Sequence, residues 1–280
     1  MVKIITDTTS CLSPEFAQRY NIPVIPQIIT FGEESFYEGA QIDIHTFMKR
    51  LRESSELPKT AAPPPELFVQ EFSRLAPLGE PIICIHPSTE VSGTVRSAVV
   101  AAREFPNLDI RIIDTGFVAS PVGTLVELAA EWAAAGQSVD IIAQKIEAWC
   151  KRCRLYFMVA TLEYLQRGGR IGGAAALIGS VLQIKPILCM RSGRVDQFER
   201  ERTHRRAVQR LKDLVDQQAP HDGTAHLTVL HAGVLLEGQE LAKDLSQIIN
   251  QPTVPVVDMP PAIVTHGGPG ILGVAFFTQE

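Results

Sequence analysis

The sequence has little net charge with which to attract an oppositely charged macromolecule. Its 280 residues carry 26 Lys and Arg side chains against 31 Asp and Glu, which leaves a net charge of −5. A protein that binds nucleic acid through its overall field needs a basic excess, so we expect no nucleic-acid partner, although a local basic patch stays open. Hydrophobic residues still make up 45% of the chain. That share is typical of soluble globular proteins, and the length favours two domains.

Long apolar segments are also missing. The longest charge-free apolar stretch of note, residues 171–184, is interrupted by three glycines, Ser180 and Gln183. A membrane-spanning helix needs about 20 apolar residues, so we expect no stable membrane insertion. Residues 1–5, with the sequence MVKII, predict a short strand rather than a secretion signal.

Cysteine is scarce and scattered. The five cysteines are Cys11, Cys84, Cys150, Cys153 and Cys189. An odd number without a secretion signal predicts reduced thiols and a cytoplasmic location. Cys150 and Cys153 form a C-x-x-C pair, which is open to a redox or half-zinc interpretation. The alternative is two small residues near the end of an amphipathic helix, and since no second pair completes a metal site, we expect neither a metal nor a cofactor.

Common catalytic signatures are absent as well. The sequence contains no P-loop, no H-E-x-x-H and no G-x-S-x-G motif. We therefore expect no catalysis by this chain alone. The alternative is an acyl hydrolase with Ser92 as nucleophile and His266 as base, although no third member of a triad is evident.

What is present is an alternation of short apolar runs and helical patterns. In the first half this alternation predicts parallel βαβ units. Strands are expected at 3–6, 23–29, 81–85 and 110–113, helices at 43–53, 66–75, 94–104, 119–135 and 139–152, and a loop at 59–65.

The second half has a different pattern. Ser192-Gly193 between two strand patterns predicts a hairpin, which favours a mixed or antiparallel sheet. Strands are expected at 155–160, 185–191, 194–199, 227–231, 254–258 and 271–277, and helices at 204–218 and 237–250. The prediction is an α/β protein with a parallel-sheet N-terminal domain, 1–155, and a mixed-sheet C-terminal domain, 156–280.

The strongest candidate site is the turn Ser92-Gly93-Thr94. It joins the strand 81–85 to the helix 94–104, so it lies at the carboxyl end of the sheet, where ligands usually bind. Gly93 allows close backbone approach, and the free N–H groups of the helix start favour an anion. Ser92 adds a hydroxyl. The alternative is an ordinary helix cap without a ligand.

Two further polar residues occupy suggestive positions. Thr60 precedes a proline-rich helix start, where the same anion argument applies more weakly; the alternative is a turn hydroxyl. His266 lies in HGGPG at 266–270, where it could approach a ligand, donate to a carboxylate or carry charge near neutral pH. Its alternative is a loop histidine packed under the sheet.

Arginines occur in two clusters. Arg167 and Arg170 flank Gly168-Gly169, and a second group surrounds the start of helix 204–218: Arg200, Arg202, Arg205 and Arg206. A guanidinium is a planar fork of donors suited to carboxylate or phosphate. Solvated surface arginines are the alternative in both places.

Taken together, the motifs resemble the DegV family of bacterial fatty-acid-binding proteins over essentially the whole chain. The matching segments follow the family's order: IITDTT at 4–9, SGTVRSA at 92–98, LEYLQRGGRI at 162–171, KPIL at 185–188, Arg202-Thr203, and HGGPG at 266–270 with Gly273. The segment 162–171 is the most specific of them.

The resemblance implies a two-domain DegV-like fold around one long-chain fatty acid, such as palmitate, stearate or oleate. It implies a buried acyl tunnel in the C-terminal domain and a carboxylate at the domain interface. The implied carboxylate-binding residues are Thr60, Ser92, Gly93 and His266, with Arg170 and Arg202 as possible phosphate or partner contacts.

The resemblance also implies a partner, a separate dihydroxyacetone-kinase-like fatty-acid kinase that makes an acyl phosphate for phospholipid synthesis. This chain would then be a monomeric carrier rather than an enzyme. A lipid-sensing regulatory protein is the third alternative.

Two segments depart from the family pattern. Thr60-Ala61-Ala62-Pro63 stands where members often have T-S-Q-P, so the polar contacts of that serine and glutamine are lost. Val95 replaces an aromatic residue often found after the SGT turn. Residues 174–182 have the small, apolar content that a tunnel wall could use, or they form an ordinary core helix.

Overall fold

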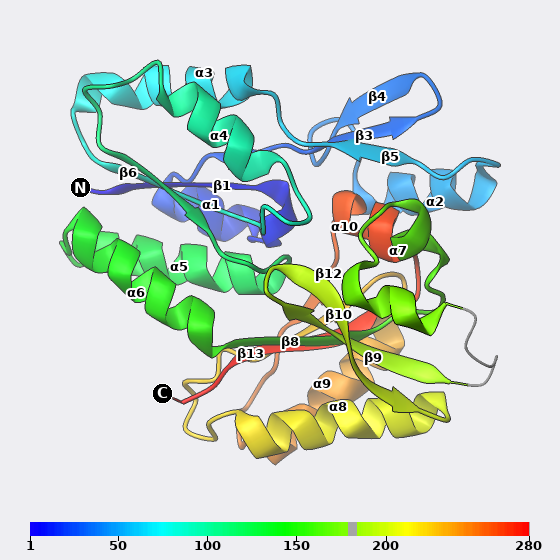
Figure 1. The fold of residues 1–280 in the computed structure, drawn as a ribbon. Helices are drawn as coiled ribbons and strands as arrows, with labels where there is room; N and C mark the ends of the chain where they lie inside the picture. The colour runs from blue at the N-terminus through cyan, green and yellow to red at the C-terminus, as the bar shows by residue number, and fades with distance from the viewer. Residues whose placement is uncertain (179–183, 280) are drawn as a thin grey trace. The chain divides into compact units, whose positions relative to one another are not determined.

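The computed structural model describes residues 1–178 and 184–279, and the chain divides into two compact units. Unit 1 runs from Met1 to Lys151 and unit 2 from Arg152 to Glu280. Figure 1 follows the chain from the N-terminal strand to the C-terminal strand. Each unit contains its own sheet and its own helices, so each is described separately.

Unit 1 contains a four-stranded parallel sheet, which confirms the predicted βαβ arrangement. The strand order is β2 (Val24–Ile25), β1 (Lys3–Asp7), β6 (Ile82–His86) and β7 (Ile110–Asp114). Every residue of β6 is buried, as expected for a central strand covered on both faces. Figure 1 shows α3 (Pro65–Leu75) and α4 (Thr94–Ala102) on one side of the sheet and α5 (Ser120–Ala134) and α6 (Val139–Arg152) on the other.

The side chains of α3 explain why this helix covers the sheet. Phe68, Phe72 and Leu75 recur at helical spacing and are all buried, so they form one apolar face. They share a core cluster with Ile5 of β1 and Cys84 of β6. This packing places the carboxyl ends of β1 and β6 at one edge of a rigid layer.

A second, antiparallel sheet in unit 1 was not expected from the sequence. Its order is β4 (Glu34–Tyr37), β3 (Ile28–Phe31) and β5 (Lys59–Ala61), and α2 (Ile44–Glu53) follows β4. The strand predicted at 23–29 is wrong as one element, since β2 and β3 belong to different sheets. Pro26 lies between them and has no N–H for a ladder. The predicted loop at 59–65 is wrong at its start, because β5 pairs Thr60 with Ile29.

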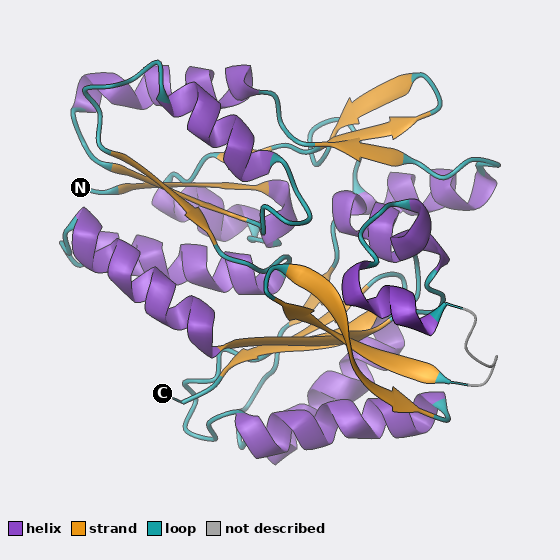
Figure 2. Ribbon diagram, viewed as in Figure 1, coloured by secondary structure: helices purple, strands orange, loops and turns teal. Residues whose placement is uncertain are grey.

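Unit 2 contains a six-stranded mixed sheet, as predicted. Its order is β10 (Arg194–Glu201), β9 (Lys185–Arg191), β8 (Cys153–Met158), β13 (Leu272–Phe277), β11 (Thr228–His231) and β12 (Val256–Asp258). The predicted hairpin is the antiparallel pair β9 and β10. Figure 2 shows the strands and helices of this unit in the same view.

The two faces of this sheet differ in side-chain size. One face packs against α8 (His204–Gln218) and α9 (Leu235–Ile248), through large residues that include Tyr156, Leu211, Leu241 and Phe276. Residues alternate between faces along a strand, so Gly273 and Ala275 of β13 lie on the opposite face from Phe276. Beside them Phe157 of β8 is also buried, at 8% exposure. The second face is therefore apolar and lined in part by small residues.

Two short helices in unit 2 were also missed. They are α7 (Glu163–Arg167) and α10 (Pro261–Gly267), which pack against each other. Residues 174–182 do not form one core helix as far as they are described. The 3₁₀-helix η3 (Gly172–Leu177) buries Ala174 and Leu177, while Ile178 is 46% exposed and 179–182 lie outside the described residues.

The two cysteines of the C-x-x-C pair lie where α6 ends and β8 begins. Cys150 is in α6 and Cys153 begins β8, where it is buried. Burial raises the pKa of the Cys150 thiol to about 12, and nearby Asp114 and Glu147 add to the effect. A thiol that stays protonated at neutral pH is a poor nucleophile, which favours the packing interpretation over redox chemistry. No cluster of three or more His, Cys, Asp or Glu that could hold a metal occurs among the described residues.

No helix within residues 1–178 and 184–279 is both long and apolar enough to cross a membrane.

Candidate functional site: a polar chain and a histidine turn

A series of buried polar side chains, here called the polar chain, starts where β1 and β6 end. Nδ1 of His86 lies 2.7 Å from Oδ2 of Asp7, and both side chains are fully buried. Nε2 of Gln27 donates to Oδ1 of Asp7 at 3.0 Å and to Oγ1 of Thr94 at 2.9 Å. Oγ1 of Thr94 lies 2.8 Å from Oγ of Ser92. The polar chain thus connects the strand ends to the turn that the sequence predicts as an anion site.

Asp7 is the most heavily hydrogen-bonded member of the polar chain. In addition to Gln27 and His86, the N–H of Thr9 donates to Oδ1 of Asp7 at 3.0 Å and its hydroxyl at 2.5 Å. Three of these contacts converge on Oδ1, and among the described residues Oδ2 faces Nδ1 of His86. Contacts on both carboxyl oxygens therefore hold Asp7 in one orientation, and Oδ1 accepts from Thr9 and Gln27.

His86 closes the other end of the polar chain. Its ring meets Phe68 edge-on, with centroids 5.3 Å apart and an interplanar angle of 88°. Nε2 of His86 is buried and has no hydrogen-bond partner in the described part of the chain. The imidazole is thus held by Asp7 on one side and an aromatic wall on the other.

The turn after β6 has the backbone expected of an anion site. Gly93 is the N-cap of α4, and it has no side chain that could cap the N–H groups at the helix start. Ser92 Oγ accepts the N–H of Thr94 at 3.3 Å, so it also caps the helix start. Ser92 is only partly buried, and the positive end of the helix dipole favours negative charge beside it. The cap and the anion site are compatible here.

The structure brings the Thr60 segment beside this turn. A Cβ atom on Gly93 would lie 3.1 Å from Cβ of Ala62, so only glycine fits without displacing that neighbour. Ala62 directly follows β5, which contains the partly exposed Thr60. Thr60, Ser92 and Gly93 therefore belong to one region of unit 1.

In unit 2, the two glycine-rich motifs pack directly on each other. A Cβ atom on Gly168 would lie 2.4 Å from Nδ1 of His266, and one on Gly268 would lie 2.5 Å from Cδ2 of Tyr164. The glycines therefore let α7 and α10 approach to contact distance. The segment 162–171 and the HGGPG motif, far apart in sequence, form one local structure.

His266 differs from the expectation in position and charge. It lies in the last turn of α10 rather than in a loop. Burial, and then the positive charge of Arg170, lower the pKa of His266 from 6.5 to about 4. The expectation that it carries charge near neutral pH is wrong, because an imidazolium would be poorly hydrated there. A neutral imidazole donates from one ring nitrogen only.

The glycines around His266 also have the spacing G-x-G-x-x-G at 268, 270 and 273. In a dinucleotide site that motif follows a strand and opens a helix. Here it follows α10 and leads into β13. The spacing therefore does not indicate a nucleotide site.

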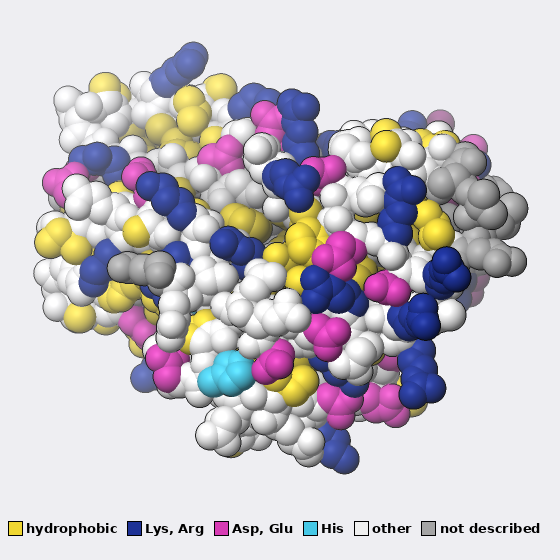
Figure 3. Space-filling view, turned by 60° about the horizontal axis from the view of Figure 1, so that its bottom comes forward, with side chains coloured by type: hydrophobic (Ala, Val, Ile, Leu, Met, Phe, Trp, Pro, Cys, Tyr) yellow, Lys and Arg dark blue, Asp and Glu magenta, His cyan; other side chains and the backbone are white. Residues whose placement is uncertain are grey.

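The arginines of unit 2 have different environments. Nη1 of Arg170 donates to the carbonyl oxygen of Gly168 at 2.7 Å, which holds it beside the α7–α10 pair. Arg167 is exposed and pairs with Glu163 at 3.1 Å. Arg202 is exposed just before Thr203, which caps α8. Figure 3 shows acidic side chains among basic ones over much of one face, with several Lys and Arg side chains gathered along its right side.

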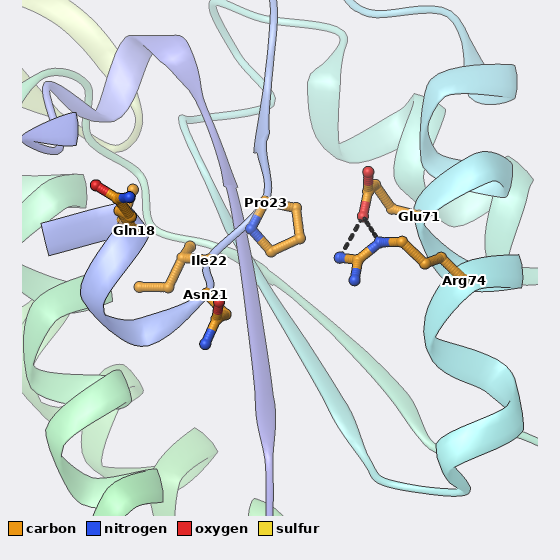
Figure 4. Close-up of a pocket in the computed structure, with 7 residues that line it drawn as sticks. Gln18, Asn21, Ile22, Pro23, Glu71 and Arg74 are labelled. Atoms are coloured by element: carbon orange, nitrogen blue, oxygen red, sulfur yellow. Dashed lines mark hydrogen bonds and ion pairs between the residues drawn. The ribbon is translucent and has the colours of Figure 1, made fainter. Parts of the chain in front are cut away.

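Unit 1 also has a hollow that contains none of the predicted site residues. It has a volume of about 380 Å³ and lies between α1 (Pro14–Tyr20) and α3; its lining is Ala17, Gln18, Asn21, Ile22, Pro23, Glu71 and Arg74. Figure 4 shows Glu71 and Arg74 side by side on α3, and Nη2 of Arg74 lies 2.7 Å from Oε2 of Glu71. Its only charged groups thus satisfy each other.

Asp7, Gln27 and His86 were not predicted from the sequence as parts of the site. Asp7 and His86 end neighbouring parallel strands, and this is the signal that could have found them. Gln27 had no such signal, because its predicted strand turned out to be two elements separated by Pro26.

The chain is a two-unit α/β protein. Unit 1 has a parallel sheet with a polar turn at the start of a helix, and unit 2 has a mixed sheet and a histidine packed among glycines. The chain belongs to the DegV family: the family described as uncharacterised DegV proteins matches residues 1–279. A DegV domain-containing protein from Streptomyces coelicolor is 36% identical over 275 residues, covering 98% of this chain and 97% of the relative.

Two solved structures of the family are similar throughout. DegV from Bacillus subtilis, a fatty acid binding protein, has a TM-score of 0.89 and 31% identity, with 99% of each chain covered. A DegV family protein from Thermus thermophilus, described for its fatty acid binding, has a TM-score of 0.88 and 29% identity, again with 99% of each chain covered. The α/β fold predicted from the motifs is confirmed by these matches.

Proposed function

We propose that this chain binds one long-chain fatty acid in a buried tunnel and holds its carboxylate at the domain interface with Thr60, Ser92, Gly93 and His266. The observation that carries the proposal is the partly exposed Ser92 hydroxyl at the start of α4, in a chain 31% identical to a fatty-acid-binding DegV. The S. coelicolor relative supports the family but not the ligand.

The chemistry of the head group supports the carboxylate assignment. A carboxylate accepts hydrogen bonds and carries negative charge. Ser92 and Thr60 offer hydroxyls, the start of α4 offers N–H groups and a positive dipole, and neutral His266 offers one N–H. These donors suit a carboxylate, which accepts hydrogen bonds at both of its oxygens.

The acyl chain would lie in unit 2. The sheet face that carries Gly273 and Ala275 is apolar and also carries Phe157 and Leu188. Burial of about 16 methylenes at about 0.8 kcal/mol each is ample for tight binding, even after the entropic cost of ordering the ligand. Palmitate, stearate and oleate are of suitable length.

The test is direct. Protein purified from cells is examined by native mass spectrometry, and its organic extract is analysed for lipids. We expect about one fatty acid per chain. A protein that is empty by both methods, and that takes up neither added palmitate nor oleate, would contradict the proposal.

We also propose that the protein presents its fatty acid to a separate, dihydroxyacetone-kinase-like kinase without catalysing a reaction itself. Arg170 and exposed Arg202 are suited to the extra negative charge of an acyl phosphate. In an assay with such a kinase, we expect Arg202→Ala to slow phosphorylation while palmitate binding stays unchanged. Arg74→Ala, which alters the hollow between α1 and α3, is the control. Equal loss of binding and phosphorylation in Arg202→Ala would show that Arg202 has no separate role.

A further inference from the structure

We infer that Gln27 is a specificity-determining residue: it fixes the direction of the hydrogen bonds along the polar chain so that Ser92 can only donate to a ligand. This inference rests on the proposed function, since the ligand head group is taken to lie at Ser92. It explains how a serine hydroxyl, which can either donate or accept, is made selective for an acceptor.

The direction starts at Asp7. Asp7 receives the N–H and hydroxyl of Thr9 and faces Nδ1 of His86, so the Gln27 atom that approaches it must be a donor. This requirement fixes the orientation of the Gln27 amide. Gln27 is itself only 3% exposed, so solvent does not compete for its NH₂ group. The same nitrogen, with two N–H bonds, reaches both Asp7 and Thr94.

The next step is the proton of Thr94. The Thr94 side chain is fully buried, and its hydroxyl accepts from Gln27, so its own proton needs another acceptor. Within the described residues the remaining partner of this hydroxyl is Ser92 Oγ, at 2.8 Å. A buried donor left unsatisfied is costly. Thr94 therefore donates to Ser92.

Ser92 completes the sequence of bonds. Its oxygen accepts the hydroxyl of Thr94 and also the Thr94 N–H, at 3.3 Å. Both of its acceptor positions are then occupied, and its proton is left over. Because Ser92 is partly exposed whereas Thr94 is not, only the Ser92 proton can point outward. A carboxylate is the strongest acceptor among common lipid head groups, so it benefits most.

Replacing Gln27 by Glu should reverse the direction with almost no change in shape. A carboxyl oxygen has at most one proton, and next to Asp7 that proton would be shared between the two carboxyl groups. The oxygen at position 27 could then only accept from Thr94. Thr94 would turn its proton to residue 27, and Ser92 would have to donate to Thr94. A lone pair of Ser92 would then face the ligand.

The experiment compares two ligands of equal chain length. Affinities for palmitate and for hexadecanol are measured on the delipidated protein by displacement of a fluorescent acyl probe. A fatty alcohol can donate or accept, so it tolerates either direction, whereas a carboxylate cannot. We expect Gln27→Glu to lower the palmitate-to-hexadecanol preference by roughly 10-fold or more. Gln70→Glu, an exposed change on α3, should keep the wild-type preference.

Two variants at position 94 make the test independent of how well Gln27→Glu folds. Thr94→Val removes the hydroxyl that directs Ser92, so the preference for palmitate should fall, while Thr94→Ser should retain it. An unchanged preference in Thr94→Val, or an equal loss of both ligands in Gln27→Glu, would overturn the inference and leave the proposed function standing. Wild-type protein that binds neither ligand would overturn both.

Discussion

Gly168 lies against His266 so closely that a Cβ atom at position 168 would come within 2.4 Å of Nδ1 of the imidazole. The backbone of Gly168 has a φ of −75°, which any residue can adopt. The glycine is therefore required here for space and not for backbone conformation. Its role is to allow the end of α7 to support the histidine.

A double-mutant cycle tests this contact. We expect Gly168→Ala to destabilise the protein by about 1–3 kcal/mol, as is usual when a methyl group is forced into a packed contact. In the background of His266→Ala the same change should cost much less, because the imidazole that the new methyl group would clash with is gone. Denaturant unfolding of the four proteins gives the coupling. Additive effects would show that the glycine does not act through His266.

The low pKa of His266 predicts a pH dependence of stability. Between pH 6.5 and about 4 the unfolded chain binds a proton at this residue and the folded chain does not. Stability should therefore fall as the pH falls through this window, by up to roughly 3 kcal/mol. Urea unfolding of delipidated protein at several pH values measures it.

The matched variant for this effect is His266→Gln, which keeps an N–H donor at this position but does not titrate. Its stability should change less than that of the wild type between pH 6.5 and 4, and the difference between the two profiles isolates His266 from the other histidines. Parallel profiles would contradict a buried neutral imidazole.

Removing either proposed hydroxyl should weaken fatty-acid binding. We expect Ser92→Ala and Thr60→Val each to cost roughly 1–3 kcal/mol of palmitate affinity, as when a charged acceptor loses a donor. The double variant should cost less than the sum, since both hydroxyls are assigned to one carboxylate. Calorimetric titration, with thermal unfolding as a check on folding, provides the values. Wild-type affinity in both single variants would remove these residues from the site.

Ester hydrolysis should be absent. The partners of the Ser92 hydroxyl among the described residues are the hydroxyl and N–H of Thr94, and neither is a base that could activate a nucleophile. Incubation with p-nitrophenyl esters, acyl-CoA and ATP should give background rates. Turnover that disappears in Ser92→Ala and in His266→Ala, while palmitate binding survives, would instead support a hydrolase.

Much of the fold was predictable because it depends on local periodicity. The buried run of β6 and the helical spacing of Phe68, Phe72 and Leu75 are visible in the sequence and were assigned correctly. The errors occurred where neighbouring residues in sequence pair with distant ones. Residues 23–29 look like one strand, and only the pairing of Thr60 with Ile29 shows that β3 belongs to another sheet.

The candidate site divides in the same way. The sequence by itself determined the chemistry at Ser92, Gly93, Thr60 and His266, because hydroxyls, glycines and helix starts carry their properties wherever the chain folds. Only the tertiary structure decided the state of these groups. It placed Asp7 and Gln27 behind Thr94, which orients the Ser92 proton, and it buried His266 beside Arg170, which removes the imidazole's charge. Both effects depend on burial and on neighbours distant in sequence, and hydrogen-bond direction and pKa follow from these surroundings rather than from residue type.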